Sequence, residues 1–159
     1  MLERLCPWCN KLHAFETECE EQKAAHVRMK ADCERRRKRD MNDAREWPPK
    51  ESTIRNWEAH GLKCAVAMGT TSYCGYVHVP EGHADERKHY DDVNVEIHGG
   101  LTFRCKAKEG GSWFGFDTAH AGDWIGFAGS DLEMPGRIWT EEDVAQETEH
   151  LAQQLSERK

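Results

Sequence analysis

The sequence lacks a long apolar run, and this absence excludes several classes of protein. None of its apolar stretches approaches the roughly 20 residues that a membrane-spanning helix needs. The first ten residues, MLERLCPWCN, also lack the apolar core of a signal peptide. We therefore expect a cytoplasmic protein with no membrane partner, in which the seven cysteines are reduced or bound to metal.

The chain also lacks an internal repeat, and its length of 159 residues suits about one domain with an appendage. Charged residues make up 32% and apolar residues 38%, which allows a core of modest size. Residues 1–46 carry a net charge near zero, whereas residues 47–159 hold most of the formal charge of −7. The larger part would repel nucleic acid over most of its surface.

Glycine and proline are absent between Thr17 and Glu46, where Ala, Glu, Lys, Arg and Gln dominate. Together with the capping-box pattern Thr17-Glu18-Cys19-Glu20, this composition predicts one long helix that ends before Pro48-Pro49. Its apolar stripe is thin, which indicates a largely solvated helix or one that pairs with a partner. Residues 52–60, STIRNWEAH, are predicted to form a short helix that ends at Gly61.

From Leu62 onward the pattern changes to short segments with period-two alternation or high apolar density. The segments are LKCAVAMG, YCGYVHVP, VNVEIHGG, LTFRCKAK and WFGFD. Gly99-Gly100 is predicted to join the third to the fourth as a two-residue hairpin, and residues 109–112 to join the fourth to the fifth. Residues 125–137 are expected to form a loop. A second capping box at Thr140 then predicts a helix whose apolar stripe docks on the sheet.

These patterns predict an α+β fold with two parts. Residues 47–159 would form an antiparallel meander sheet of four to five strands, packed by the C-terminal helix. Residues 1–46 would form a zinc-knuckle-like segment followed by the long helix.

The N-terminal part carries a cysteine pattern typical of zinc binding. Cys6-Pro-Trp-Cys9 places two thiolates on a tight turn, and His13 and Cys19 follow. Four nitrogen and sulfur ligands suit a closed, tetrahedral structural zinc, so we expect zinc as a cofactor here. His26 is an alternative to His13, and free thiols are the alternative to a zinc site.

The basic run Arg35-Arg36-Arg37-Lys38-Arg39 after a zinc knuckle raises nucleic acid as a partner. Flanking acids and the spread of the run around the whole helix argue against it. The thin helix stripe and six tryptophans instead favour a homo-oligomer.

The larger part contains a cluster of imidazoles, carboxylates and glycines near predicted strand ends, where functional sites often lie. The residues expected to bind a ligand are His83, His98, Gly99, Gly100, Arg104, Asp117, His120 and Asp123. Such side chains suit an open metal site, an Asp–His acid–base couple, or an anion site with Arg104 as the cation. Alternatively, Asp117 and Asp123 cap turns and His120 is a packing residue. The cluster matches no established motif such as H-E-x-x-H.

Four segments of the larger part resemble a known group of sequences. They are CGYVHVPEGH, YDDVNVEIHGGLTF, WFGFDTAHAGDW and WTEEDVAQETEHLAQQL. They are similar to small, mostly uncharacterised bacteriophage and prophage proteins that share a His-Gly-Gly-Leu-Thr…Gly-Phe-Asp-x-Ala-His-Ala-Gly-Asp pattern. The resemblance covers residues 57 to 155. It implies a phage origin, and hence the host-cell cytoplasm, but it implies no activity.

Three functions are therefore expected. The first is a phage accessory protein that binds a small phosphorylated or nucleotide-like ligand, by analogy with phage proteins that counter host defence signals. The second is a metal-dependent hydrolase that uses the His/Asp cluster. The third is a zinc-bearing module that interacts with nucleic acid or protein.

Overall fold

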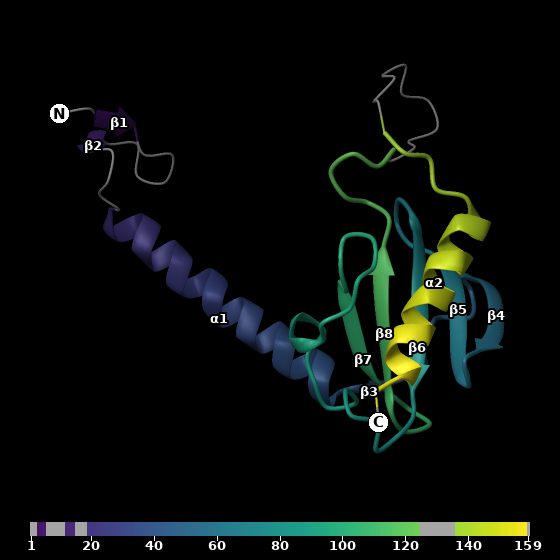
Figure 1. The fold of residues 1–159 in the computed structure, drawn as a ribbon. Coiled ribbons are helices and arrows are strands. Elements are labelled where there is room, and N and C mark those ends of the chain that lie inside the picture. The colour runs from purple at the N-terminus through teal and green to yellow at the C-terminus, as the bar shows by residue number, and fades with distance from the viewer. Residues whose placement is uncertain (1–2, 6–11, 15–18, 125–135, 159) are drawn as a thin grey trace. The chain divides into compact units, whose positions relative to one another are not determined.

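The protein has an α+β fold in two compact units (Figure 1). The structure is a computed structural model that describes residues 3–5, 12–14, 19–124 and 136–158. The units are Met1–Arg39 and Asp40–Lys159. The second unit thus begins before the boundary expected after residue 46, because residues 44–45 pair with its sheet.

The first unit contains a short hairpin and most of the long helix. Strands β1 (Glu3–Leu5) and β2 (Leu12–Ala14) pair antiparallel, and helix α1 (Glu20–Asn42) follows. Cys19 occupies the N-cap position, since its sulfur accepts the N–H of Gln22 at 3.3 Å and its carbonyl accepts that of Lys23. The helix is shorter than predicted, and Thr17 and Glu18 of the predicted capping box lie outside the described residues.

The second unit contains a six-stranded mixed sheet in the order β3-β7-β8-β6-β5-β4. Its strands are β3 (Ala44–Arg45), β4 (Thr53–Ala59), β5 (Leu62–Met68), β6 (Tyr73–Val79), β7 (Phe103–Ala107) and β8 (Ser112–Asp117). Strands β4, β5 and β6 form an antiparallel meander, and β7 and β8 form the predicted hairpin. The prediction of a single meander was only partly right, because β8 inserts between β6 and β7 and β3 pairs parallel to β7.

Within the segment 52–60, Thr53–Ala59 forms the edge strand β4, so the prediction of a helix was wrong. Alternate side chains of β4 are half-buried, and two of them reach the C-terminal helix. Trp57 Nε1 donates to Glu149, and Arg55 pairs with Glu142. His60 and Gly61 both have positive φ, so they form the two-residue turn of a β4–β5 hairpin rather than a helix terminus.

Residues 93–100 were predicted to be a strand, and this too was wrong. The alternation is real in its burial, since Val93 is buried and Val95 and Ile97 pack against the same core. The backbone, however, bonds to side chains of the C-terminal helix instead of to a neighbouring strand. Gln154 accepts the N–H of Glu96 at 2.8 Å and donates to its carbonyl at 2.9 Å. A period-two pattern indicates which side chains are buried. The backbone hydrogen bonds of such a segment can be made by side chains of a helix as well as by a neighbouring strand.

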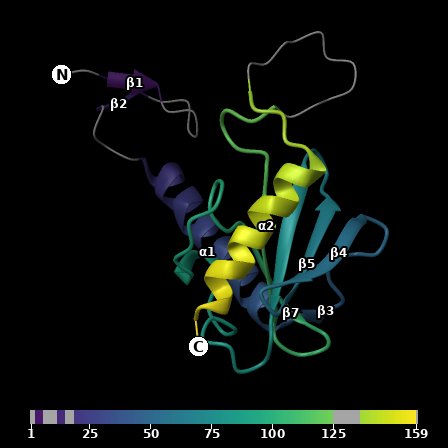
Figure 2. The same ribbon diagram turned by 45° about the vertical axis from the view of Figure 1, so that its right-hand side comes forward.

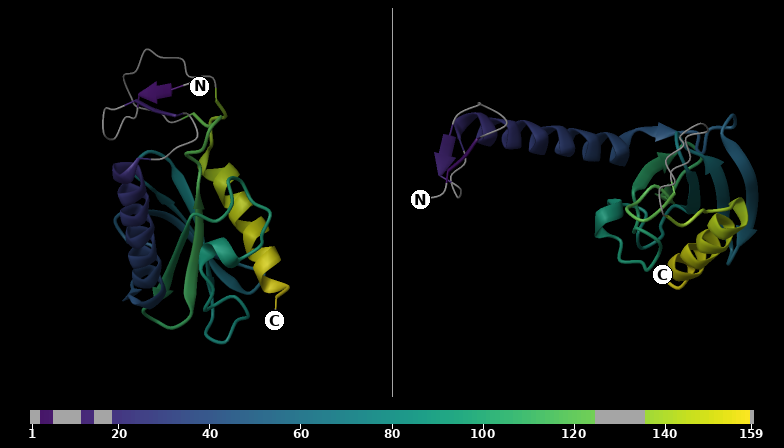
Figure 3. Two further views of the ribbon diagram at one scale, coloured as in Figure 1. Left: turned by 90° about the vertical axis from the view of Figure 1, so that its left-hand side faces the viewer. Right: turned by 90° about the horizontal axis from the view of Figure 1, so that it is seen from above.

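Helix α2 (Glu141–Ser156) packs along one face of the sheet, as predicted (Figures 2 and 3). The predicted stripe Val144, Thr148, Leu151 and Leu155 is fully buried. It packs with Phe114 and other apolar side chains of the sheet in one cluster, and Tyr76, Trp113 and Trp47 belong to a second cluster. Within the described residues, no helix is long and apolar enough to cross a membrane.

The start of α2 gives a first prediction. Thr140 and Asp143 form the predicted capping box, and their hydrogen bonds lower the pKa of the Asp143 carboxyl. We expect Thr140→Ala to lower the free energy of unfolding by about 1 kcal/mol, measured by urea denaturation. Ser156→Ala, at the exposed end of the same helix, is the control and should change it by less than about 0.5 kcal/mol. Equal effects of the two variants would show that the cap does not stabilise α2.

Candidate functional site

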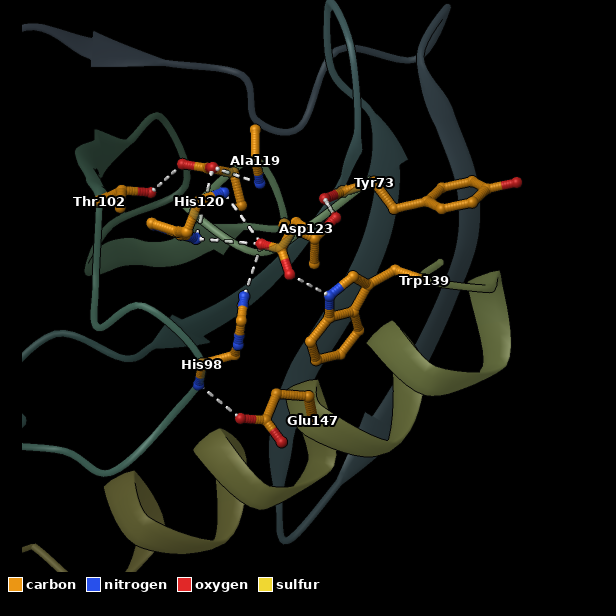
Figure 4. A network of polar contacts seen from close by, with 10 residues as sticks. Tyr73, His98, Thr102, Ala119, His120, Asp123, Trp139 and Glu147 are labelled. Atoms are coloured by element: carbon orange, nitrogen blue, oxygen red, sulfur yellow. Dashed lines mark hydrogen bonds and ion pairs between the residues drawn. The ribbon is translucent and has the colours of Figure 1, made fainter. Parts of the chain in front are cut away.

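His98, His120 and Asp123 come together at one end of the sheet (Figure 4). Each offers one ligand atom, and these atoms lie within 4.8 Å of one another. His98 ends the segment that crosses from β6 to β7, whereas His120 and Asp123 lie in the loop after β8. We call these three residues the His/Asp cluster.

Asp123 is the centre of the His/Asp cluster. Its side chain is 2% exposed. Oδ2 accepts from His98 Nε2 at 2.7 Å and from the backbone N–H of His120 at 2.9 Å, and Oδ1 accepts from Trp139 Nε1 at 2.9 Å. Burial alone would raise the pKa of this carboxyl, but the three hydrogen bonds outweigh it and lower the pKa. Asp123 is therefore an anion whose position is fixed from three directions.

His98 is held on its backbone and on its ring. Its N–H donates to Glu147 of α2 at 2.7 Å, and its ring packs against Trp139 with 4.5 Å between ring centroids. Because Nε2 contacts the carboxylate of Asp123, that nitrogen carries the proton in the arrangement shown. The side chain remains 27% exposed, so solvent reaches the ring.

His120 presents a ring nitrogen that lacks a hydrogen bond. Its Nδ1 is buried and has no partner among the described residues. That atom lies 3.7 Å from Oδ2 of Asp123 and 4.0 Å from Oδ1 of Asp117, beyond hydrogen-bonding distance of either. A buried polar atom without a partner costs free energy, so this nitrogen is an unusual feature of the site.

Gly99 makes room for the ring of His120. A Cβ atom on Gly99 would lie 2.2 Å from Cε1 of His120, and the φ of +66° is one that other residues rarely adopt. Gly100 has a similar φ of +77°, but a Cβ atom there would meet nothing within 4 Å. The first glycine of the pair is therefore required by the site, and the second only by the turn.

This difference gives a matched pair of variants. Both Gly99→Ala and Gly100→Ala introduce backbone strain, but only the first also drives a methyl group into the His120 ring. We expect Gly99→Ala to be more destabilising than Gly100→Ala by about 1–3 kcal/mol, measured by urea denaturation. The imidazole NMR signals of His120 should shift in Gly99→Ala alone. Indistinguishable behaviour of the two variants would contradict the packing described.

Asp117 has the turn-forming role that the sequence offered as the alternative. Its Oδ1 accepts the N–H of Ala119 at 3.0 Å, and its Oδ2 accepts from Thr102 at 2.8 Å. Asp123 also braces its own turn through the N–H of His120, so both interpretations of these aspartates have support in the structure.

Two predicted site residues lie away from the His/Asp cluster. Arg104 is buried, and its guanidinium donates to the carbonyls of Asp40 and Glu86 and to the hydroxyl of Ser112. His83 contacts the carbonyl of Leu155 at the end of α2. Arg104 therefore holds backbone segments together, and it does not supply the cation expected beside the cluster.

The sequence reasoning missed Trp139, Glu147 and Arg137. Trp139 bonds to Asp123, Glu147 holds His98, and the guanidinium of Arg137 lies 3.6 Å from the centroid of the Trp139 ring. The backbone of Arg137 also pairs with residues beside Asp123. A tryptophan directly before a helix cap was the one available signal, since a buried indole N–H needs an acceptor.

The cysteines divide into two groups. Burial raises the pKa of the Cys64 thiol to about 11 and that of Cys105 to about 12, so these thiols stay protonated. Of the predicted zinc ligands, Cys6 and Cys9 lie outside the described residues, between strands β1 and β2. His13 belongs to β2, and Cys19 caps α1.

Two cavities of the second unit are relevant to the site, and the residues of the His/Asp cluster line neither of them. One cavity of about 870 Å³ is lined by Trp47, Trp113 and several charged residues, and no cluster residue takes part. A smaller cavity of about 250 Å³ adjoins the cluster through Trp139. Cavity volume alone therefore does not locate the His/Asp cluster.

Comparisons with protein-family models, curated proteins and solved structures found no match to this chain. The resemblance to phage proteins thus stays a prediction from the quoted segments. The proposals about function therefore rest on the geometry of the His/Asp cluster.

Proposed function

We propose that the His/Asp cluster binds a divalent transition-metal ion and that the protein is a metal-dependent hydrolase. The buried, partnerless Nδ1 of His120 beside the carboxylate of Asp123 is the observation that carries this proposal. An ion would supply the partner that this nitrogen lacks. Two imidazoles and one carboxylate are also ligands that such ions prefer.

Two of the three separations between ligand atoms in the cluster are close to those of a metal site. Two ligand atoms of one tetrahedral zinc ion lie about 3.3 Å apart when each bond is about 2.0 Å long. The observed separations from Oδ2 of Asp123 are 2.7 Å to His98 and 3.7 Å to His120. Binding would thus lengthen one distance and shorten the other by about half an ångström each. His98 would give up its proton, as an imidazole does when it binds metal.

The number of protein ligands favours catalysis over a structural role. Structural zinc sites are closed by four protein ligands, whereas catalytic sites have three and keep one position open. Among the described residues the cluster offers three ligands, and the His98 and His120 side chains are 27% and 28% exposed although Nδ1 of His120 itself is buried. A bound divalent ion supplies a Lewis acid and an activated water for hydrolysis of a carbonyl or phosphoryl group. Glu147 and Trp139 would position His98 and Asp123 throughout.

Binding of a small anionic or nucleotide-like ligand is the second candidate. Arg104 lies elsewhere, but Arg137 is half-exposed and lies over Trp139, next to the cluster. An anion would then contact the ion and Arg137. The phage origin and the role against host defence remain proposals that rest on the resemblance alone.

We also retain the structural zinc site in the first unit as a proposal. Its support is the pairing of strands β1 and β2, which precede and follow Cys6 and Cys9 in the sequence, and the thiol of Cys19 at the N-terminus of α1. A cytoplasmic location remains a proposal that rests on the sequence. Nucleic-acid binding through residues 35–39 and homo-oligomer formation remain alternatives for this unit.

The test must separate the two proposed metal sites. Cobalt(II) bound by thiolates gives intense sulfur-to-metal absorption, whereas cobalt(II) bound by imidazole and carboxylate does not. We expect Cys6→Ser/Cys9→Ser protein to bind about one equivalent of cobalt without thiolate absorption, and His120→Ala to abolish that binding. Hydrolysis of p-nitrophenyl acetate and p-nitrophenyl phosphate should then follow cobalt occupancy. Cobalt binding unaffected by His120→Ala would refute the proposal.

A further inference from the structure

A cavity of about 250 Å³ lies directly beside the His/Asp cluster. Trp139 belongs to both, since it lines the cavity and its indole N–H donates to Asp123 at 2.9 Å. Thr118, which also lines the cavity, follows Asp117 and donates its hydroxyl to the carbonyl of Tyr73. The cavity and the proposed metal site are therefore neighbours that share a wall.

A group of exposed apolar side chains lines this cavity. Met68, Trp124 and Ile138 all line it, and they are 45%, 41% and 65% exposed. In the described part of the second unit, Ile54 is the one other exposed large apolar side chain. Single exposed apolar residues are ordinary, but a group of them around one hollow indicates a binding site.

The chemistry of the lining narrows the occupant. None of the described lining residues is charged. Tyr73, Trp124 and Trp139 supply aromatic rings, and Thr70, Thr71 and Ser72 supply hydroxyl groups. The volume is below the roughly 300–1,000 Å³ of typical ligand pockets, so only part of a molecule fits. Aromatic rings, a few hydroxyls and the lack of charge among the described lining residues suit a single uncharged aromatic group.

We propose that this cavity holds an uncharged aromatic group of the substrate while the polar group attached to it reaches the His/Asp cluster. The first half of this proposal is that the cavity binds an aromatic group. The second half, that the attached polar group is the substrate of the cluster, rests on the proposed hydrolase function. The first half stands without it, because the cavity exists whether or not the cluster binds metal. Binding of the aromatic group is therefore expected in metal-free protein.

Two matched probes test the aromatic preference. Benzyl alcohol and cyclohexylmethanol have the same carbon skeleton, but only the first has an aromatic ring. Both would be titrated into the metal-free full-length protein and followed by saturation-transfer NMR. Because aromatic pairs contribute about 0.5–1.5 kcal/mol beyond area burial, we expect benzyl alcohol to bind up to about tenfold more tightly. Equal binding of the two, or no binding of benzyl alcohol, would overturn the proposal.

Three variants locate the binding. Trp124→Ala and Met68→Ser each change an exposed wall of the cavity, and both should weaken benzyl alcohol binding by several-fold. Ile54→Ala is the matched control, since Ile54 is 43% exposed and does not line the cavity. Binding that falls equally in Ile54→Ala, or that survives both wall variants, would place the probe elsewhere and refute the proposal.

One more variant separates failure of the cavity proposal from failure of the proposed hydrolase function. His120→Ala is expected to lose metal while it keeps benzyl alcohol binding. Loss of metal binding with an intact probe site would support both halves. Probe binding in a protein that never binds metal would leave the cavity assigned and refute the hydrolase.

Discussion

Asp123→Asn is expected to remove metal binding at the His/Asp cluster. Loss of an outer-shell partner of a metal ligand costs about 10- to 100-fold in affinity, and loss of the ligand itself should cost more. The substitution keeps the volume of the side chain but leaves one oxygen for the donors that now bond to two. We therefore also expect a loss of about 1–3 kcal/mol in the free energy of unfolding. Cobalt titration and urea denaturation measure the two effects.

Asp117→Asn is the matched control for this variant. Asp117 ends strand β8, directly before the loop that carries Asp123, and also braces a turn, but it is not one of the three clustered residues. An asparagine oxygen can still accept the N–H of Ala119, so metal affinity should change by less than about tenfold. If Asp117→Asn weakens cobalt binding as much as Asp123→Asn, the ligand set proposed here is wrong.

Arg104→Ala is expected to be one of the most destabilising substitutions in the second unit. The guanidinium donates to two backbone carbonyls and one hydroxyl, and its removal would break these three charge-assisted hydrogen bonds, although Ser112 would still donate to the Glu86 carbonyl. Hydrogen bonds to charged groups contribute about 1.5–3 kcal/mol each, so we expect a loss of at least about 3 kcal/mol in the free energy of unfolding.

Lys106→Ala is the control for Arg104→Ala. Lys106 lies in the same strand with an exposed side chain, and its removal should cost less than about 1 kcal/mol. The anion-binding interpretation of Arg104 predicts the opposite pattern, with normal stability and lost ligand affinity. Urea denaturation of the two variants therefore decides between a structural and a functional role for this arginine.

The elements predicted best are those in which local signals agree with tertiary packing. Helix α2 has both a capping box and an apolar stripe, and the β7–β8 hairpin has alternating strands around a glycine turn. Residues 93–100 were predicted wrongly because their partners in α2 are distant in sequence. Residues 52–60 were predicted wrongly because Gly61 is typical of a helix end, whereas it belongs to the turn that leads into the neighbouring strand β5. Side chains of α2 form hydrogen bonds with both segments, and no local sequence pattern predicts Glu147 or Gln154 as a partner.

The convergence of His98, His120 and Asp123 could be predicted from their positions beside glycines and at the ends of apolar segments. The support around them could not, because Trp139 and Glu147 reach the cluster only through the docking of α2 and the segment before it. Arg104 misled the prediction, since a cation in a strand can equally bind buried backbone carbonyls.

The most direct test of the metal proposal is anomalous diffraction from crystals of the protein equilibrated with zinc. We expect an anomalous peak about 2.0–2.2 Å from one atom each of His98, His120 and Asp123, with His98 no longer hydrogen-bonded to the carboxylate. A structure at saturating zinc that keeps the 2.7 Å hydrogen bond between His98 and Asp123, with no peak between the three side chains, would contradict it.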